Sequence, residues 1–127
     1  MKDDSSPTLL TIASVDDLFG AVPALLKLDP DAVLASNEMQ AVGLIAGLHA
    51  AGVRVPDDIA VVALNGTAAA RFTIPALTAV HLSIEQLAGD IADALAPGST
   101  RTTIETDARL VVRASCGCLP GSESDNA

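Results

Sequence analysis

Aromatic side chains are almost absent from this chain of 127 residues, which has no tryptophan, no tyrosine and only two phenylalanines. A site that stacks sugars or bases on aromatic rings therefore has few side chains from which to be built. Half of the residues are nonetheless apolar, so aliphatic side chains must form the core. A chain of this size is expected to form one domain that buries roughly two-thirds of its unfolded surface.

Basic residues are also scarce, since seven Lys and Arg stand against sixteen Asp and Glu and give a formal net charge of −9. This excess repels phosphate backbones, so the chain is not expected to bind nucleic acid directly. No apolar run approaches the roughly 20 residues needed to cross a bilayer. The polar residues 1–7 do not form a secretory signal. We therefore expect a cytoplasmic protein without a membrane span.

The motifs of common enzymes are missing as well. No Gly-x-Ser-x-Gly elbow, Gly-x-Gly-x-x-Gly loop or Gly-Lys-Ser/Thr loop follows a predicted strand, so no catalytic role and no cofactor are predicted. Cys116 and Cys118 are too close for easy disulfide geometry and too few for a metal cage. His49 and His81 have no partner at ligand spacing, so no metal site is expected. Three serines are interpreted as helix caps, namely Ser14, Ser36 and Ser115.

Short β-rich runs alternate with longer stretches of helical periodicity, a pattern typical of βα units around a largely parallel sheet. Strands are predicted over residues 8–13, 32–36, 59–64, 77–82, 103–105 and 109–113. Helices are predicted over residues 14–28, 37–51 and 83–95. We expect an α/β fold with an open, mostly parallel sheet, flanking helices and a returning edge strand, formed by residues 8–118. The tails, residues 1–7 and 119–127, are expected to be disordered.

Local signals support the helices. The predicted N-caps are Asn37 alone and two pairs that resemble capping boxes, Ser14 with Asp17 and Ser83 with Gln86. Gly52 occupies the position where helices commonly close through a left-handed residue. Helical spacing predicts buried faces of Leu18, Phe19, Val22, Leu25 and Leu26 in the first helix and of Met39, Val42, Ile45 and Leu48 in the second.

Candidate binding residues follow from the predicted sheet. Ligands of open α/β sheets bind beyond the carboxyl ends of the strands. The polar or small residues at these ends are Ser14, Asn37, Glu38, Asn65 and Gly66. Two amides and a carboxylate are suited to reading the hydroxyls or amides of a small polar ligand. The same residues also have a structural interpretation as caps and a turn, which spacing alone favours.

Four segments resemble successive landmarks of the effector domain of the lactose/galactose-repressor (LacI/GalR) family: DAVLASNEMQA (31–41), AAGVRVPDDIAVVALN (50–65), IPALTAV (74–80) and LVVRAS (110–115). Their order and spacing match over residues 32–116. The resemblance implies a type I periplasmic-binding-protein-like fold, in which two lobes close on a sugar, nucleoside or related metabolite. It also implies that closure of the two lobes changes the arrangement of the subunits in a DNA-binding dimer.

The chain resembles only the C-terminal part of that domain, without the DNA-binding headpiece and nearly all of the first lobe. The resemblance implies that Asn37 and Asn65 contact the effector, with Ser14 and Glu38 as further candidates. The family usually has Asn-Asp where this chain has Asn37-Glu38, and an aromatic residue with Asp where it has Leu64-Asn65. The lost carboxylate and ring disfavour a typical sugar. The resemblance also implies a homodimer with four interface candidates: Val42, Ile45, His49 and Phe72.

The leading hypothesis is a small-molecule effector-sensing domain of a LacI/GalR-like regulator, whose contact with DNA depends on a headpiece that is absent here. One alternative is a non-binding remnant that serves as a dimerisation or interaction module. Another is the same lobe attached to a different signalling output. A phospho-receiver domain is disfavoured, because the predicted strands end in Ser14, Asn37 and Asn65 instead of an acceptor Asp.

Overall fold

A computed structural model describes residue 8 and residues 17–118 of the chain. Within these residues the strands are β1 (Ala32–Ala35), β2 (Ala60–Ala63), β3 (Thr78–Leu82) and β4 (Ala108–Val111). The α-helices are α1 (Leu18–Leu26), α2 (Glu38–Ala50) and α3 (Ile84–Leu95). Two short 3₁₀ helices are η2 (Ala68–Phe72) and η3 (Ala114–Cys116).

The strands form one open sheet in the order β1-β2-β3-β4. β2 pairs in parallel with both β1 and β3, whereas β4 returns antiparallel to β3. The mostly parallel sheet and its returning edge strand are therefore confirmed. Because the first three strands are parallel, their carboxyl ends meet at one edge of the sheet.

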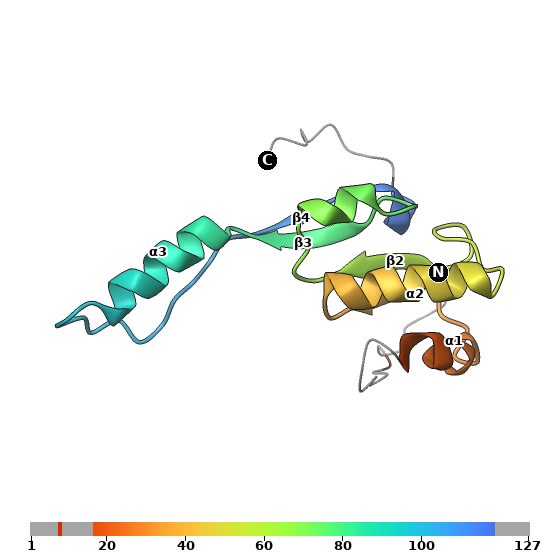
Figure 1. Ribbon diagram of the computed structural model, residues 1–127, viewed down its shortest axis with the longest axis horizontal. Helices are drawn as coiled ribbons and strands as arrows, with labels where there is room; N and C mark the ends of the chain where they lie inside the picture. Colours follow the sequence, from red (N-terminus) through yellow and green to blue (C-terminus); the bar gives the residue numbers. More distant parts are fainter. Residues whose placement is uncertain (1–7, 9–16, 119–127) are drawn as a thin grey trace.

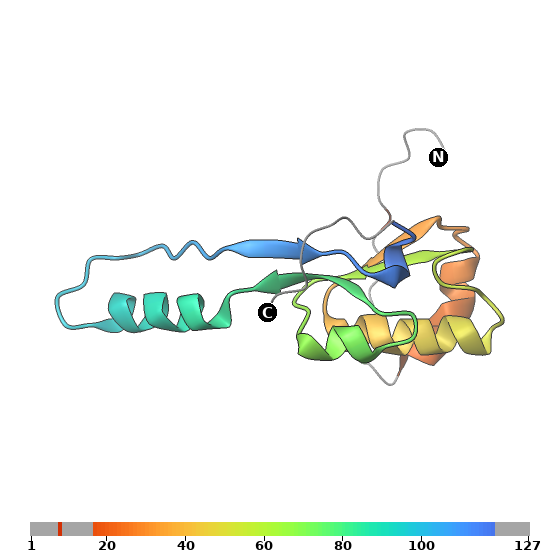
Figure 2. The same cartoon turned by 90° about the horizontal axis from the view of Figure 1, so that it is seen from above.

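The core lies between the sheet and two helices. Figure 2 shows α2 running alongside the parallel strands, and α1 lies against α2. The buried apolar side chains belong mainly to these elements: Val22, Leu25, Ala41, Leu44, Ile45, Leu48, Val61, Ala63, Leu77 and Ala79. The aliphatic core that the composition predicts is therefore the one that forms.

Two predicted core residues instead face solvent. Phe19 in α1 is 57% exposed and Met39 in α2 is 62% exposed. In α2 the buried face begins with Ala41, which is fully buried and lets the helix approach the sheet closely. The buried face of α2 therefore differs from the predicted one. Because α2 has apolar residues on several sides, periodicity alone could not determine which side packs on the sheet.

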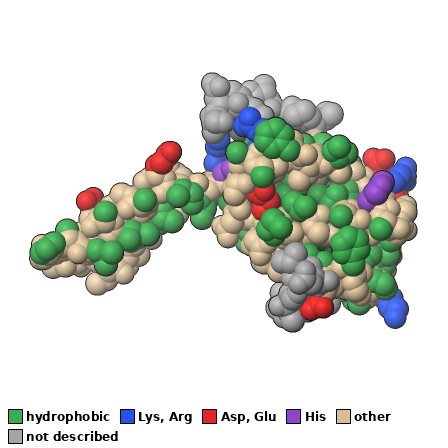
Figure 3. Space-filling view, viewed as in Figure 1, with side chains coloured by type: hydrophobic (Ala, Val, Ile, Leu, Met, Phe, Trp, Pro, Cys, Tyr) green, Lys and Arg blue, Asp and Glu red, His purple; other side chains and the backbone are tan. Residues whose placement is uncertain are grey.

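α3 projects from this body as an arm (Figure 1). The chain runs from β3 into α3 and returns to the body through the segment before β4. None of its residues is buried, and the large apolar side chains Ile84, Ile91 and Leu95 are exposed. Apolar side chains run along the arm in the space-filling view (Figure 3). An amphipathic helix of this kind has an apolar face that nothing in the described chain covers.

Four further expectations have different outcomes. The strand predicted over residues 103–105 is wrong: this segment lies beyond the end of the sheet beside α3, where no strand is available to pair with it. The predicted Ser83 capping box is also wrong, because the Ser83 side chain makes no cap hydrogen bond. The first strand, apart from Thr8, lies outside the described residues. The left-handed Gly52, with φ of +76°, is confirmed.

Candidate functional site

The carboxyl ends of β1 and β2 place Asn37 and Asn65 at the same edge of the sheet. Asn37 is the N-cap of α2, and its Oδ1 atom accepts a hydrogen bond of 2.9 Å from the amide of Gln40. The structural interpretation of Asn37 is therefore confirmed. The cap fixes the Asn37 side chain at the start of α2.

Glu38 is a buried carboxylate that clamps the loop after β2. Only 9% of the residue is exposed, and its Oε2 accepts a short hydrogen bond from the backbone amide of Thr67. Its Oε1 accepts from the Thr67 hydroxyl at 3.2 Å, and that hydroxyl accepts from the amide of Ala69 at 3.1 Å. The carboxylate therefore already has two partners within the chain, and it holds the loop that carries Asn65.

The loop after β2 is fixed on both sides. The amide of Leu64 donates to Ala35 at 3.0 Å, and the amide of Gly66 donates to Val80 at 2.8 Å. Asn65 stands between them, exposed and in the left-handed region with φ of +53°. A side chain at Gly66 would overlap Ala79 and crowd His81, so glycine is required there. Backbone bonds and a close approach to β3 thus present the Asn65 amide to solvent.

His81 is a site residue that the sequence prediction missed. It lies in the second half of β3, and its Nε2 atom would be 3.0 Å from a Cβ at Gly66. Nη1 of Arg113 lies 3.5 Å from the same Nε2 atom. The pairing of Ala63 with Ala79 places His81 level with Asn65, and the sequence alone does not give this register. Thr67 was missed too, although a threonine before Ala-Ala-Ala is a typical cap signal.

The three serines interpreted as caps have different positions. Ser14 lies outside the described residues. Ser36 is exposed, and its hydroxyl donates to Oε1 of Gln40 at 2.6 Å, so it does not cap the helix. Ser115 is fully buried and is also no cap: its Oγ donates to the Val61 carbonyl at 2.6 Å and accepts from the Thr78 amide at 2.9 Å. The Ser115 hydroxyl therefore joins β2 to β3.

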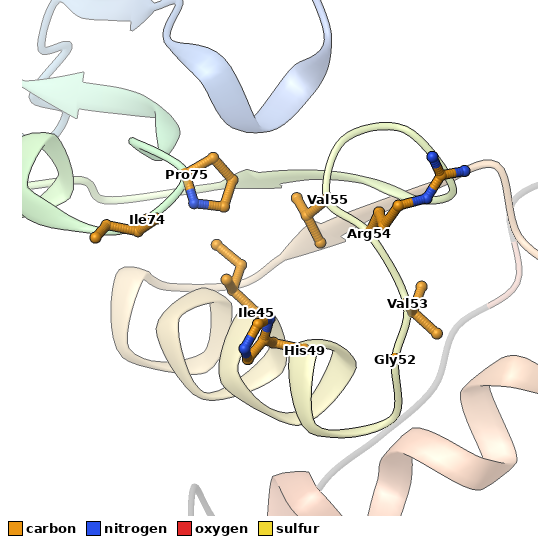
Figure 4. A pocket seen from close by; sticks show the side chains of 8 residues that line it. All are labelled: Ile45, His49, Gly52, Val53, Arg54, Val55, Ile74 and Pro75. Carbon is orange, nitrogen blue, oxygen red and sulfur yellow. The ribbon is translucent and has the colours of Figure 1, made fainter.

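A pocket of about 390 Å³ lies elsewhere, where α2 ends and β2 and β3 begin. Figure 4 shows its lining, which comes from α2, the loop before β2 and the segment before β3: Ile45, His49, Gly52, Val53, Arg54, Val55, Ile74 and Pro75. These residues precede the strands, whereas Asn37 and Asn65 follow them. The pocket is therefore separate from the edge of the sheet where Asn37 and Asn65 lie.

The positive charge of Arg54 beside this pocket is neutralised by neighbouring carboxylates of the same chain. Two guanidinium nitrogens of Arg54 donate to the Asp58 carboxylate at 2.9 and 2.6 Å, and Asp57 lies within 3.6 Å. The hydrogen bond from the Arg54 side chain lowers the pKa of Asp58 to about 2. With two carboxylates next to it, Arg54 does not offer the pocket an unpaired positive charge, and the remaining lining is mostly apolar.

The four predicted interface residues differ in exposure. Phe72, at the end of η2, is 79% exposed, and Ile74, two residues further along, is 92% exposed. His49 is exposed and Val42 is half-buried, whereas Ile45 is only 6% exposed and packs in the core. His49 and Ile45 line the pocket, as does Ile74.

Comparison with known proteins gives one consistent family. The model of the periplasmic binding protein-like domain matches residues 4–116. The chain is 39% identical to the lactose operon repressor of Rhizobium radiobacter over 67 residues, which are 53% of the chain. It is 34% identical to the HTH-type transcriptional repressor PurR of Mannheimia succiniciproducens over 108 residues, or 79% of the chain.

The solved structures agree with the sequence matches. A LacI family transcriptional regulator from Lactobacillus casei with bound glucose superposes with a TM-score of 0.68 and 31% identity, over 82% of this chain and 40% of that one. The chain spans 58% of the lactose operon repressor and 32% of the PurR repressor. The relatives are thus transcriptional regulators of which this chain corresponds to a part.

Proposed function

This chain belongs to the periplasmic binding protein-like domain family of LacI-type regulators, and from that premise we propose that it contributes one wall of a small-molecule effector site. The observation that supports the proposal is the position of Asn37 and Asn65 just after the paired strands β1 and β2, with His81 of β3 close to Gly66 in the same loop. Their side chains supply amide and imidazole groups that donate to and accept from a polar ligand. No catalytic role is part of the proposal.

In the proposed site, some residues contact the ligand and others hold the contacting residues in place. We assign ligand contact to Asn65 and to the Nδ2 group of Asn37, whose Oδ1 atom serves the helix cap. Glu38 acts mainly through Thr67, because its carboxylate is buried and already bonded to that residue. Ser14 stays a candidate from the sequence alone. A polar effector without a strong need for aromatic stacking fits this set, for example a sugar derivative, nucleoside or polyol.

A thermal-shift screen tests this function. One lobe encloses a ligand incompletely, so the expected dissociation constant is roughly 1 mM, or about −4 kcal/mol. At about 10 mM, such a ligand stabilises the native state by about 1.4 kcal/mol and raises the melting temperature. Glucose, lactose, ribose, adenosine and a polyol form the panel. A flat response to the whole panel and to related metabolites at this concentration would count against the proposal.

Asn65→Gly is the variant that separates contact from folding. Glycine adopts the left-handed conformation of Asn65 without strain, whereas alanine would add a penalty of about 1–2 kcal/mol at this φ. We expect Asn65→Gly to weaken binding by about 1–3 kcal/mol while the melting temperature without ligand stays close to that of the parent. Unchanged affinity in a folded Asn65→Gly protein would assign Asn65 to the turn alone.

We also propose that the chain forms a homodimer through Phe72, Ile74 and the pocket beside them. Both side chains are exposed, Ile74 lines a mostly apolar hollow, and Phe72 precedes Ile74 by two residues. A two-fold contact would place each copy's side chains against the other's pocket. Phe72→Asp is expected to shift sedimentation towards monomer. Leu95→Asp is the matched control, because Leu95 is equally exposed at 79% but lies on α3. Equal effects of the two substitutions would contradict this interface.

One observation favours the second candidate, an interaction module without an effector. Within the described residues, the large apolar side chains Ile84, Ile91 and Leu95 of α3 are exposed, and a surface of this kind is typical of a segment that packs on another protein part. This module would dimerise but give no response to the ligand panel. The thermal-shift screen therefore discriminates between the two functions, because both are expected to dimerise and only one responds to a ligand.

A further inference from the structure

The segment Cys116-Gly117-Cys118 folds into a tight turn that gathers two free thiols. The amide of Cys118 donates to Sγ of Cys116 at 3.3 Å, and Sγ of Cys118 lies 3.8 Å from the carbonyl oxygen of Cys116. Both sulfur atoms therefore lie close to the backbone of residue 116. Cys116 is half-buried and Cys118 is exposed, so the pair is open to solvent on one side.

The rest of the fold holds this turn in place. Ser115 immediately precedes it, and the amide of Ser115 donates to Ala76 at 2.9 Å while its hydroxyl bonds to β2 and β3. Gly117 has φ of +69°, and its amide donates to Ala114 at 3.3 Å. A Cβ at Gly117 would lie 3.4 Å from Pro56, so the turn packs against a neighbouring loop. The two thiols are thus mounted on an ordered support.

We propose that Cys116 and Cys118 together bind one soft monovalent cation of the Cu⁺ class. The sequence predicts no metal site because two thiols are too few for an ion that takes four ligands. Thiolate sulfur is nevertheless the ligand that soft ions select, and two sulfurs complete the coordination of an ion that accepts two ligands. Binding displaces one proton from each thiol and involves no change in oxidation state. This site is independent of the proposed effector site at the strand ends.

The number of ligands decides between classes of ion. Zinc takes four protein ligands in structural sites and at least three in catalytic ones. No group of three or more His, Cys, Asp and Glu side chains is gathered among the residues that the structure describes. A disulfide is the other product open to two thiols, and it requires an S–S distance of about 2.05 Å. An ion that bridges the two sulfurs does not require them to come into bonding contact.

Silver is a suitable probe, because Ag⁺ is a soft monovalent ion that does not change oxidation state in buffer. The reduced full chain is titrated with Ag⁺ in chloride-free buffer, with stoichiometry from native mass spectrometry and affinity from competition with a small thiol. We expect one Ag⁺ per chain and a higher melting temperature. Cys118→Ser removes one sulfur from an exposed position, so the fold is retained and affinity falls about a hundredfold or more.

Gly117→Ala is the variant that tests the turn while keeping both sulfurs. Alanine at a φ of +69° and in contact with Pro56 displaces the turn, so weaker Ag⁺ binding is expected with both thiols still titratable. Two Ag⁺ ions per chain, or equal affinity in the parent and Cys118→Ser proteins, would show independent thiols and overturn the proposal. Zn²⁺ that raises the melting temperature as much as Ag⁺ does would overturn the two-ligand class of ion.

Discussion

Replacing Glu38 by Gln tests whether its buried carboxylate supports the loop after β2. Gln keeps the size of the side chain but replaces a carboxylate oxygen with an NH₂ group, so both hydrogen bonds from Thr67 lose charge assistance. We expect a loss of about 1–2 kcal/mol from these bonds. The loss of a negative charge in the first turn of α2 adds about 0.3–1 kcal/mol.

Glu85→Gln provides the matched control. Glu85 lies in the first turn of α3, where it is exposed, so its substitution changes the helix-dipole interaction without breaking a clamp. Urea unfolding at pH 7, followed by circular dichroism, measures both variants. With a slope of roughly 1.5 kcal/mol/M, Glu38→Gln should lower the midpoint by about 1–2 M and Glu85→Gln by less than about 0.7 M. Equal midpoint shifts would refute the clamp.

Two further predictions concern stability and protonation. Ser115→Ala leaves the Val61 carbonyl and the Thr78 amide without their buried partner, so thermal unfolding should show that the free energy of unfolding falls by about 2–4 kcal/mol. The exposed Ser36→Ala is the control and should cost less than about 0.5 kcal/mol. Similar losses in the two variants would contradict the bridging role. The lowered pKa of Asp58 means that its pair with Arg54 stabilises the fold above its ordinary pKa of 3.8 and stops doing so as the pH falls through about 2. Carbon NMR titration should find this pKa near 2 and nearer 3.8 in Arg54→Met, and an unchanged pKa would contradict the pairing.

Local signals explain why much of the fold was predictable. Asn37 and Gly52 mark the two ends of α2 by their cap and left-handed conformations, and the structure has both. The alternation of strands and helices predicts a parallel sheet, because crossover helices must join parallel neighbours. The strand-end rule then brings Asn37 and Asn65 to one edge, as the pairing of β1 with β2 confirms.

What the sequence could not supply depends on contacts between distant residues. The partner of Glu38 is Thr67, which lies 29 residues further along the chain, so no local pattern distinguishes a clamp from a ligand contact. Ser115 likewise bridges residues 54 and 37 positions away. The helical pattern of α3 predicts an apolar face correctly, but periodicity does not say whether this chain covers it. The structure leaves that face open.

The most direct test of the effector site is NMR mapping of a ligand from the thermal-shift panel on the isotopically labelled chain. Backbone amide shifts during titration report which residues a bound molecule touches. We predict the largest saturable changes at Asn37, at Asn65 to Thr67 and at His81, with little change around the pocket residues Val53 and Ile74. Changes centred on that pocket, or uniform changes that do not saturate, would contradict a ligand site at the carboxyl ends of the strands.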